Sequence, residues 1–309
     1  MPEPSSLRLP VLADIQSAQS EYQHIALNWV GMEQIDLPLE FEGRPVMAKV
    51  NAGINLLNNQ HAAKGIHMSR LYMQLDDLTQ GEVTPGTVQG VLKAFLRSHE
   101  GQSSEASLSI KGELLLSRKS LISNYYGWKA YPIELTATLN EACVFHIKVG
   151  IPYASTCPNS AALSRQSAQV AFQRDFEGQE DNLTMEAVNE WLGTKGMPAT
   201  PHSQRSWAWI EAELNMQATQ FPFRQLIDAG ENALGTAVQT VVKRGDEQAF
   251  AQACGSHLMF CEDAARRLHQ RLLKESGFAG FSIHVEHQES LHAHNAVARV
   301  RFQGVGHVA

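Results

Sequence analysis

The sequence has few cysteines, no long apolar run and no excess of positive charge, and each shortage excludes a class of protein. Four cysteines in 309 residues match neither a small secreted disulfide scaffold nor a paired CxxC zinc site. No apolar stretch approaches the roughly 18 residues of a membrane span, and no basic, apolar leader opens the chain. We therefore expect a cytoplasmic protein that does not bind membranes.

The charge balance argues against nucleic acid as a partner. The net charge is −7 and the sequence pI is about 6.0, whereas a phosphate backbone favours a broad lysine and arginine surface. With 43% hydrophobic and 18% charged residues, the composition is that of an ordinary globular protein with one large core or two smaller ones. We expect two modules.

Polarity alternates with a period of two along much of the first half, which predicts strands. One segment differs: Val88, Val91, Leu92 and Phe95 have helical spacing, and Thr84 precedes Pro85 as an N-cap. That pattern predicts a helix over Pro85–Leu96. The run Leu114–Leu116 breaks strict alternation and suggests a bulge or a fully buried strand. The predicted strands are Glu21–Glu42, Arg44–Leu56, Ser107–Ser117 and Trp128–Ile151.

The second half repeats this order without repeating the sequence. Strands are predicted over Ser206–Thr219, Phe278–His287 and Asn295–Phe302, and helices over Phe223–Lys243 and Asp246–Lys274. A polar insertion at 166–201 carries a short helical piece near Met185–Leu192. The expected fold is α+β, with two tandem modules at 1–153 and 154–309, each an antiparallel sheet backed by helices on one face.

Ligand-type residues concentrate in a few segments of the second half. Cys157, His202, Glu247 and His292 together offer a thiolate, imidazoles and a carboxylate, the mixed set that a catalytic metal site uses. Each residue alone has an ordinary alternative. The cysteine also fits a partly buried structural thiol, His202 a surface or capping residue, and Glu247 a solvated residue near a helix start.

Six short motifs, named at the end of this paragraph, occur in a fixed order along the chain, and such an ordered set is more specific than any one motif. The set resembles the successive motifs of the type IB GTP cyclohydrolases, a prokaryotic, metal-dependent family with the tunnelling fold. The motifs are Lys64-Gly-Ile-His-Met-Ser-Arg70, Cys157-Pro-Asn-Ser-Ala-Ala-Leu-Ser-Arg165, Thr200-Pro-His-Ser-Gln-Arg-Ser206, Asp246-Glu247, Phe260-Cys-Glu-Asp263 and Glu289-Ser-Leu-His-Ala-His294.

The resemblance implies that GTP is the substrate and that metal-activated water opens its imidazole ring. The products would be 7,8-dihydroneopterin triphosphate, which enters folate biosynthesis, and formate. It also implies homo-oligomers, with tetramers expected, whose subunits join sheets into barrels and form sites at their interfaces. One divalent metal per site is expected, and zinc, manganese and ferrous iron all suit a Cys/His/Glu set.

Individual roles follow from the matching motifs. Cys157, His202 and Glu247 would hold the metal, and His292 would ligate it or shuttle protons. The catalytic residues implied are Cys157, Glu289, His292 and His294. For substrate binding, Glu262 would anchor guanine, while Lys64, His67, Arg70 and Arg205 would meet the triphosphate. The basic set around His67 fits a solvated cluster equally well.

Two features depart from the family pattern or limit its use. The second cysteine that the family often carries is replaced by Asn159, which leaves open a catalytically silent pterin- or purine-binding protein. A nitrile reductase of the same fold is a third alternative, but no nicotinamide motif is present.

Glu247 and Glu262 would lie roughly 22 Å apart on one unbroken helix. We therefore expect them to meet across a subunit interface rather than through a helix break near Gly255.

Overall fold

The computed structural model describes residues 15, 25–58, 64–179 and 183–303. Eight strands form one antiparallel sheet in chain order, from β1 to β8. Their bounds are β1 Leu27–Phe41, β2 Arg44–Leu56, β3 Ala106–Lys119, β4 Tyr126–Leu139, β5 Cys143–Thr156, β6 Ser203–Leu214, β7 Phe278–His287 and β8 Ala296–Gln303.

Helices accompany this sheet, as expected for the α+β class, and those that pack on it lie against one face. In the first half they are α1 Met68–Leu75, the 3-10 turn η1 Asp76–Thr79 and α2 Pro85–Ser98. In the second half they are α3 Pro158–Asp175, α4 Met185–Lys195, α5 Phe223–Leu234, α6 Arg244–Ser256 and α7 Cys261–Leu272. Pairing of β5 with β6 joins the two expected sheets into one. Residue 153, the expected module boundary, lies inside β5, and the division into two modules stays a prediction.

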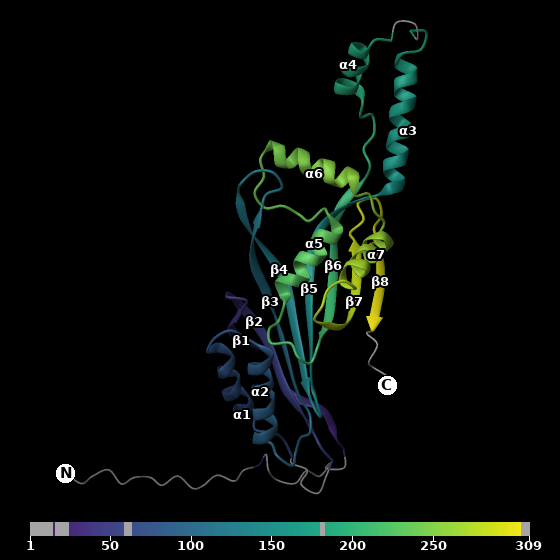
Figure 1. The fold of residues 1–309 in the computed structure, drawn as a ribbon. Helices are drawn as coiled ribbons and strands as arrows, with labels where there is room; N and C mark the ends of the chain where they lie inside the picture. The colour runs from purple at the N-terminus through teal and green to yellow at the C-terminus, as the bar shows by residue number, and fades with distance from the viewer. Residues whose placement is uncertain (1–14, 16–24, 59–63, 180–182, 304–309) are drawn as a thin grey trace, which may run out of the picture.

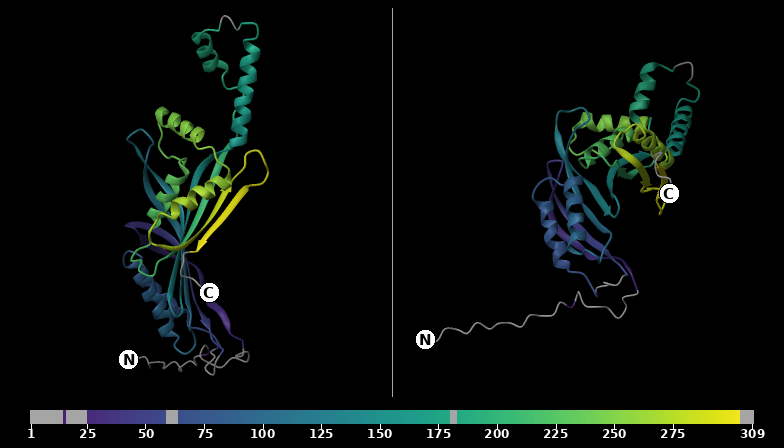
Figure 2. Two further views of the ribbon diagram at one scale, coloured as in Figure 1. Left: turned by 45° about the vertical axis from the view of Figure 1, so that its right-hand side comes forward. Right: turned by 60° about the horizontal axis from the view of Figure 1, so that its bottom comes forward.

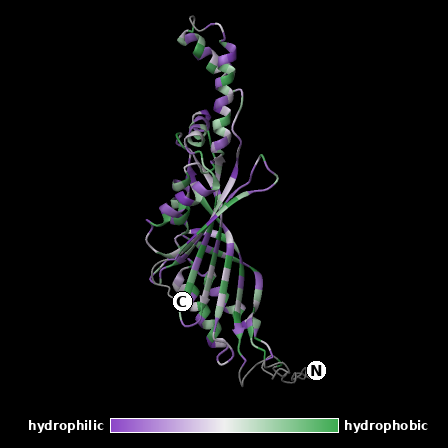
Figure 3. Cartoon of the chain, turned by 90° about the vertical axis from the view of Figure 1, so that its right-hand side faces the viewer, coloured by the Kyte–Doolittle hydropathy of each residue, from purple (hydrophilic) through white to green (hydrophobic). Residues whose placement is uncertain are grey.

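The alternation of polarity accounts for the core. Along β2, Val46, Ala48, Val50, Ala52 and Ile54 are all buried, while Met47, Lys49 and Asn51 between them are exposed or half-buried. The same banding runs along the strands in Figure 3. The helix α2 buries the four apolar residues that predicted it, and Thr84 and Thr87 cap it reciprocally, with Thr87 N donating to Thr84 Oγ1 at 3.2 Å.

Several sequence-based boundaries were wrong. The range Trp128–Ile151 contains two strands, because the chain turns tightly after Asn140. The Oδ1 of Asn140 accepts a hydrogen bond from Ala142 N in this turn. The helix predicted to Lys243 ends at Leu234, since Gly235 adopts a left-handed φ of 73° and caps it. The run Leu114–Leu116 is neither bulged nor fully buried, because its pairing with β4 is regular and Leu115 is 46% exposed.

Other corrections concern helices and the chain ends. The helix predicted over Asp246–Lys274 is broken at 257–260 into α6 and α7. The insertion at 166–201 is more helical than expected, since α3 starts at Pro158 and α4 extends to Lys195. The strand predicted from Glu21 begins at Leu27, and its residues 21–24 lie outside the described residues.

The views in Figures 1 and 2 show how the parts are arranged. Helices α3 and α4 form an arm that projects from one end of the sheet, whereas α1 and α2 lie beside the first strands at the other end. Within the described ranges, no helix is long and apolar enough to cross a membrane.

Candidate functional site

Cys157 and His202 lie next to each other where β5 ends and β6 begins. The last pair of this ladder is Thr156 with Ser203, and Cys157 N donates to His202 O at 3.2 Å just beyond it. Cys157 is the N-cap of α3, and its sulfur accepts from Ser160 N at 3.5 Å. Ser160 Oγ accepts from His202 N at 3.1 Å. The start of the arm and the end of the sheet therefore share one hydrogen-bonded junction.

The ring of His202 is oriented by two neighbours. Its Nδ1 lies 3.0 Å from Gln204 Oε1 and 3.6 Å from Glu289 Oε2. Glu289 follows β7, so its position depends on the third strand of this end of the sheet. With Nδ1 carrying the proton toward these oxygens, Nε2 presents its lone pair, which is the arrangement common in metal-ligating histidines. The structure thus brings three of the predicted residues together: Cys157, His202 and Glu289.

A buried polar cluster lies beneath this junction and was not predicted from the sequence. Tyr153 Oη lies 2.8 Å from His287 Nε2, and Ser155 Oγ lies 2.8 Å from Ser206 Oγ. Gln204 Nε2 donates to Ser155 Oγ at 2.6 Å. One feature of the sequence could have predicted this cluster. Polar residues occupy inward-facing positions of β5, β6 and β7, where the alternation of polarity predicts apolar residues.

Burial fixes the protonation of this cluster. It lowers the pKa of His287 to about 4, while the nearby Glu262 carboxylate opposes the shift only in part. It also raises the pKa of Tyr153 well above its usual range. Both side chains are therefore neutral at pH 7, and their mutual hydrogen bond needs no charge.

Glu262 is held near the same end of the sheet. The segment before α7 is joined to β5 because Met259 N donates to Thr156 O at 3.3 Å. Glu262 stands in the first turn of α7, where hydrogen bonding to its own backbone N–H lowers the pKa of its carboxyl group. It lines a hollow of about 350 Å³ between α7 and β8, together with Arg266, His269 and Arg299. An ionised, accessible carboxylate at this place accepts hydrogen bonds only.

Glu247 lines a different cavity. This cavity, of about 480 Å³, lies between the start of β6, the loop after α5 and the first turns of α6. Gln204 and Arg205 line it on the β6 side, facing Val238 and Thr240 of the loop. The predicted residues Glu247 and Arg205 therefore share a cavity that adjoins the strand segment following His202.

The remaining predicted residues are not gathered with these. His292 and His294 are exposed in the turn between β7 and β8, with their rings stacked at 5.0 Å. Lys64, His67 and Arg70 lie at or before α1, at the opposite end of the sheet from the arm (Figures 1 and 2). Arg70 donates there to Ser98 O at 2.9 Å. Across the described ranges, no three histidine, cysteine, aspartate or glutamate side chains converge on a point that could hold a metal ion.

The break between α6 and α7 corrects the helix argument. Glu247 and Glu262 stand on separate helices, so the 22 Å separation expected of one continuous helix does not apply. They nevertheless line separate hollows, the first beside Arg205 and the second beside β8. Whether they meet across subunits stays a prediction.

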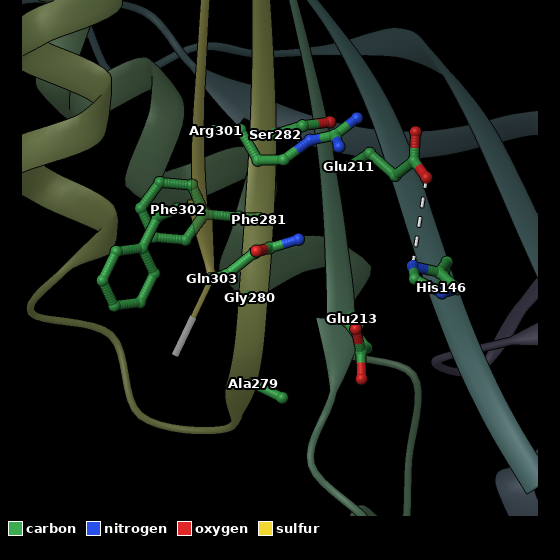
Figure 4. Close-up of a pocket in the computed structure, with 10 residues that line it drawn as sticks. All are labelled: His146, Glu211, Glu213, Ala279, Gly280, Phe281, Ser282, Arg301, Phe302 and Gln303. Atoms are coloured by element: carbon green, nitrogen blue, oxygen red, sulfur yellow. Dashed lines mark ion pairs between the residues drawn. The ribbon is translucent and has the colours of Figure 1, made fainter. Parts of the chain in front are cut away.

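A further hollow lies on the sheet face that carries no helix. Figure 4 shows its lining, with His146 Nδ1 3.9 Å from Glu211 Oε1 and Arg301 nearby. Its volume is about 250 Å³. None of the predicted site residues lines it, and we do not assign the site to this face.

Comparison with known proteins identifies the family of this chain. The family model described as "Type I GTP cyclohydrolase folE2" matches residues 12–298. The chain is 61% identical to GTP cyclohydrolase FolE2 of Klebsiella pneumoniae, over 95% of this chain and 98% of the relative. It is 48% identical to the protein of the same name from Pseudomonas putida (strain GB-1), over 97% of each.

Solved structures add a likeness of fold alone. The uricase of Arthrobacter globiformis superposes with a TM-score of 0.50 at 8% sequence identity, covering 92% of this chain and 96% of the uricase. This supports the tunnelling fold predicted from the motifs.

Proposed function

Because the chain belongs to the type I GTP cyclohydrolase FolE2 family, we propose that its chemistry takes place where Cys157 meets His202. The overall reaction opens the imidazole ring of GTP and yields 7,8-dihydroneopterin triphosphate and formate. The observation that supports this location is the junction itself, in which a thiol and an oriented imidazole emerge side by side from paired strands. No observation favours a catalytically silent protein.

The donor set suits one divalent ion. Cys157, His202 and Glu247 would hold it, with His292 as a further ligand or as the proton carrier, and zinc, manganese and ferrous iron all suit such a mixed set. When bound, the ion supplies Lewis-acid activation of water at neutral pH. Glu289, which lies against His202 Nδ1, would keep the ring in the ligating orientation.

The chain's own residues would bind and orient the purine. Glu262 offers two acceptor oxygens to the guanine N1–H and exocyclic amine, a pair of donors that adenine lacks. Its lowered pKa keeps it in the accepting form. An imidazole both accepts and donates protons, so His292 or His294 would protonate the ring nitrogen as the C–N bond breaks.

Binding of the triphosphate would involve Arg205, which lines the cavity beside Glu247. Lys64, His67 and Arg70 would join it only if another subunit brings them there, because α1 lies at the far end of the sheet.

A homo-oligomer, with a tetramer as the expected form, would complete the site. Two features support this: the candidate ligands are divided within one chain, and the turn between β3 and β4, together with the start of β4, exposes large apolar side chains. Ile122 is 67% exposed, Tyr126 62% and Trp128 58%, and such a group is typical of a protein interface. We place the enzyme in the cytoplasm, where GTP is available.

The proposal is tested with purified protein that has been stripped by a chelator and then supplied with Mn²⁺, Zn²⁺ or Fe²⁺. Incubation with GTP should release formate and yield a pterin that fluoresces after oxidation, whereas ATP should give neither. Failure of all three metals to restore turnover in a folded, oligomeric protein would overturn the proposal.

A further inference from the structure

Asp246 has a conspicuous environment that the reaction does not explain. It is 1% exposed and stands in the first turn of α6. Its Oδ1 accepts from Ile122 N at 2.8 Å and from Ser123 N at 2.9 Å. Its Oδ2 accepts from Ser123 Oγ at 2.5 Å and from Lys243 N at 2.9 Å. Both oxygens are thus fully engaged, three times by the turn between β3 and β4 and once by its own helix.

Neighbouring contacts hold the same two segments together. Ser120 Oγ donates to Val241 O at 2.6 Å, and the Lys243 ammonium lies 4.5 Å from the centre of the Tyr125 ring. Behind the turn, Lys129 Nζ donates to Val238 O at 3.1 Å. The loop after α5, which lines the cavity beside Glu247, is therefore fixed by β4 and by the turn between β3 and β4.

We propose that Asp246 is a positioning residue, which locks the start of α6 to the β3–β4 turn and thereby aims Glu247 into the cavity lined by Gln204 and Arg205. Successive helical residues point about 100° apart, so fixing Asp246 against the turn fixes the direction of the next side chain. Asp246 is not itself a ligand, because its acceptor positions are filled and it is buried. This inference rests on the ligand role proposed above for Glu247.

The direct test is Asp246→Asn. The amide keeps one acceptor oxygen for the turn but places an NH₂ group against Lys243 N–H, so the α6 cap is lost. We expect faster hydrogen exchange at the amides of Ile122, Ser123 and Lys243. We also expect Mn²⁺ affinity of the stripped protein to fall by about 10- to 100-fold, the usual effect of removing an orienting partner, with a similar loss of turnover.

A matched control is Asp175→Asn in the arm. Asp175 likewise accepts from several donors, including Trp191 Nε1 at 3.1 Å and Lys195 Nζ at 3.2 Å, and these donors belong to the arm itself. Its replacement should speed exchange in the arm alone and leave Mn²⁺ affinity unchanged. Ser123→Ala, which removes one hydrogen bond from Asp246, provides a milder variant if Asp246→Asn does not fold.

The outcomes separate this inference from the proposed function. Faster exchange together with weakened Mn²⁺ binding supports the positioning role. The positioning role is overturned if Asp246→Asn exchanges faster but keeps wild-type Mn²⁺ affinity and turnover. If only Ser123→Ala folds, the same result in that variant overturns it. Glu247→Ala is measured in parallel: if that variant also binds Mn²⁺ and turns over normally, it is the ligand assignment that fails.

Discussion

A buried ion-pair network joins strands β3 and β4 to helix α5, and removing one charge from it should destabilise the protein measurably. Lys129 Nζ on β4 lies 2.7 Å from Glu231 Oε1 on α5, and the two side chains are only 6% and 16% exposed. Tyr131 Oη donates to the same oxygen at 2.6 Å, and Arg118 Nε lies 3.6 Å from Oε2. The change Glu231→Gln keeps the shape and one acceptor but removes the negative charge.

The magnitude follows from this geometry. At 2.7 Å and an effective dielectric constant of about 20, the attraction of one unit pair is roughly 6 kcal/mol before desolvation is subtracted. Breaking buried pairs costs about 3–5 kcal/mol, because the remaining charge is left uncompensated. Since the amide oxygen still accepts from Lys129, we expect the lower end, about 3 kcal/mol. In a chain of this size that lowers Tm by roughly 6 °C.

The assay is thermal unfolding at fixed scan rate and protein concentration, with circular dichroism as the readout. Glu134→Gln is the matched control, since its partner Lys111, at 3.1 Å, is 57% exposed and such surface pairs contribute at most about 1 kcal/mol. Adding Lys129→Met to Glu231→Gln should recover at least half of the lost Tm, because it removes the unpaired ammonium. A Glu231→Gln protein that melts with the wild type, or a double variant that loses the sum of both changes, would refute the reasoning.

Three further outcomes are expected. Cys157→Ala should abolish metal-dependent turnover and metal retention, measured by elemental analysis, while the circular dichroism spectrum is unchanged. Asn159→Ala should matter much less, and near-normal activity and metal content in the cysteine variant would contradict the ligand assignment. Because the folded pKa of His287 is about 4 against an ordinary 6.5, the unfolded chain binds more protons between these values. Stability should therefore fall as pH drops from about 6.5 to 4, by up to about 3 kcal/mol, and urea titrations should show a smaller pH slope in His287→Gln. Finally, mixing inactive Glu247→Ala and Glu262→Ala oligomers after dissociation should restore some activity if the two glutamates meet across subunits, whereas dead hybrids of proven mixed composition would place both in one subunit.

Elements whose local pattern and tertiary role agree were predictable from the sequence. The helix α2 has an N-cap threonine, a proline in the first turn and an apolar stripe that faces the sheet, and every one of these signals is local. The strands β2 and β7 match their predicted ranges, since one face is buried and the other is not. The ordered motifs also sufficed to identify the family.

Elements that depend on their surroundings were misread. The helix α3 projects into solvent and buries only Ala161, so it lacks the apolar stripe that marks a helix packed on a core. The separation of α6 from α7 is stabilised by contacts that are distant in sequence, such as Met259 N with Thr156 O. No periodicity records a contact of that kind.

The candidate site divides in the same way. Residue type and motif order alone pointed to Cys157, His202 and Glu262, because the chemistry of a ligand or acceptor belongs to the side chain itself. Only the tertiary structure placed Cys157 beside His202, set Glu289 against the imidazole and paired Tyr153 with His287. It also showed Asp246 clamped by a turn more than 120 residues earlier in the chain. Those relations arise from strand pairing and burial, which bring together backbone and side-chain groups whose separation along the sequence carries no information about their distance in space.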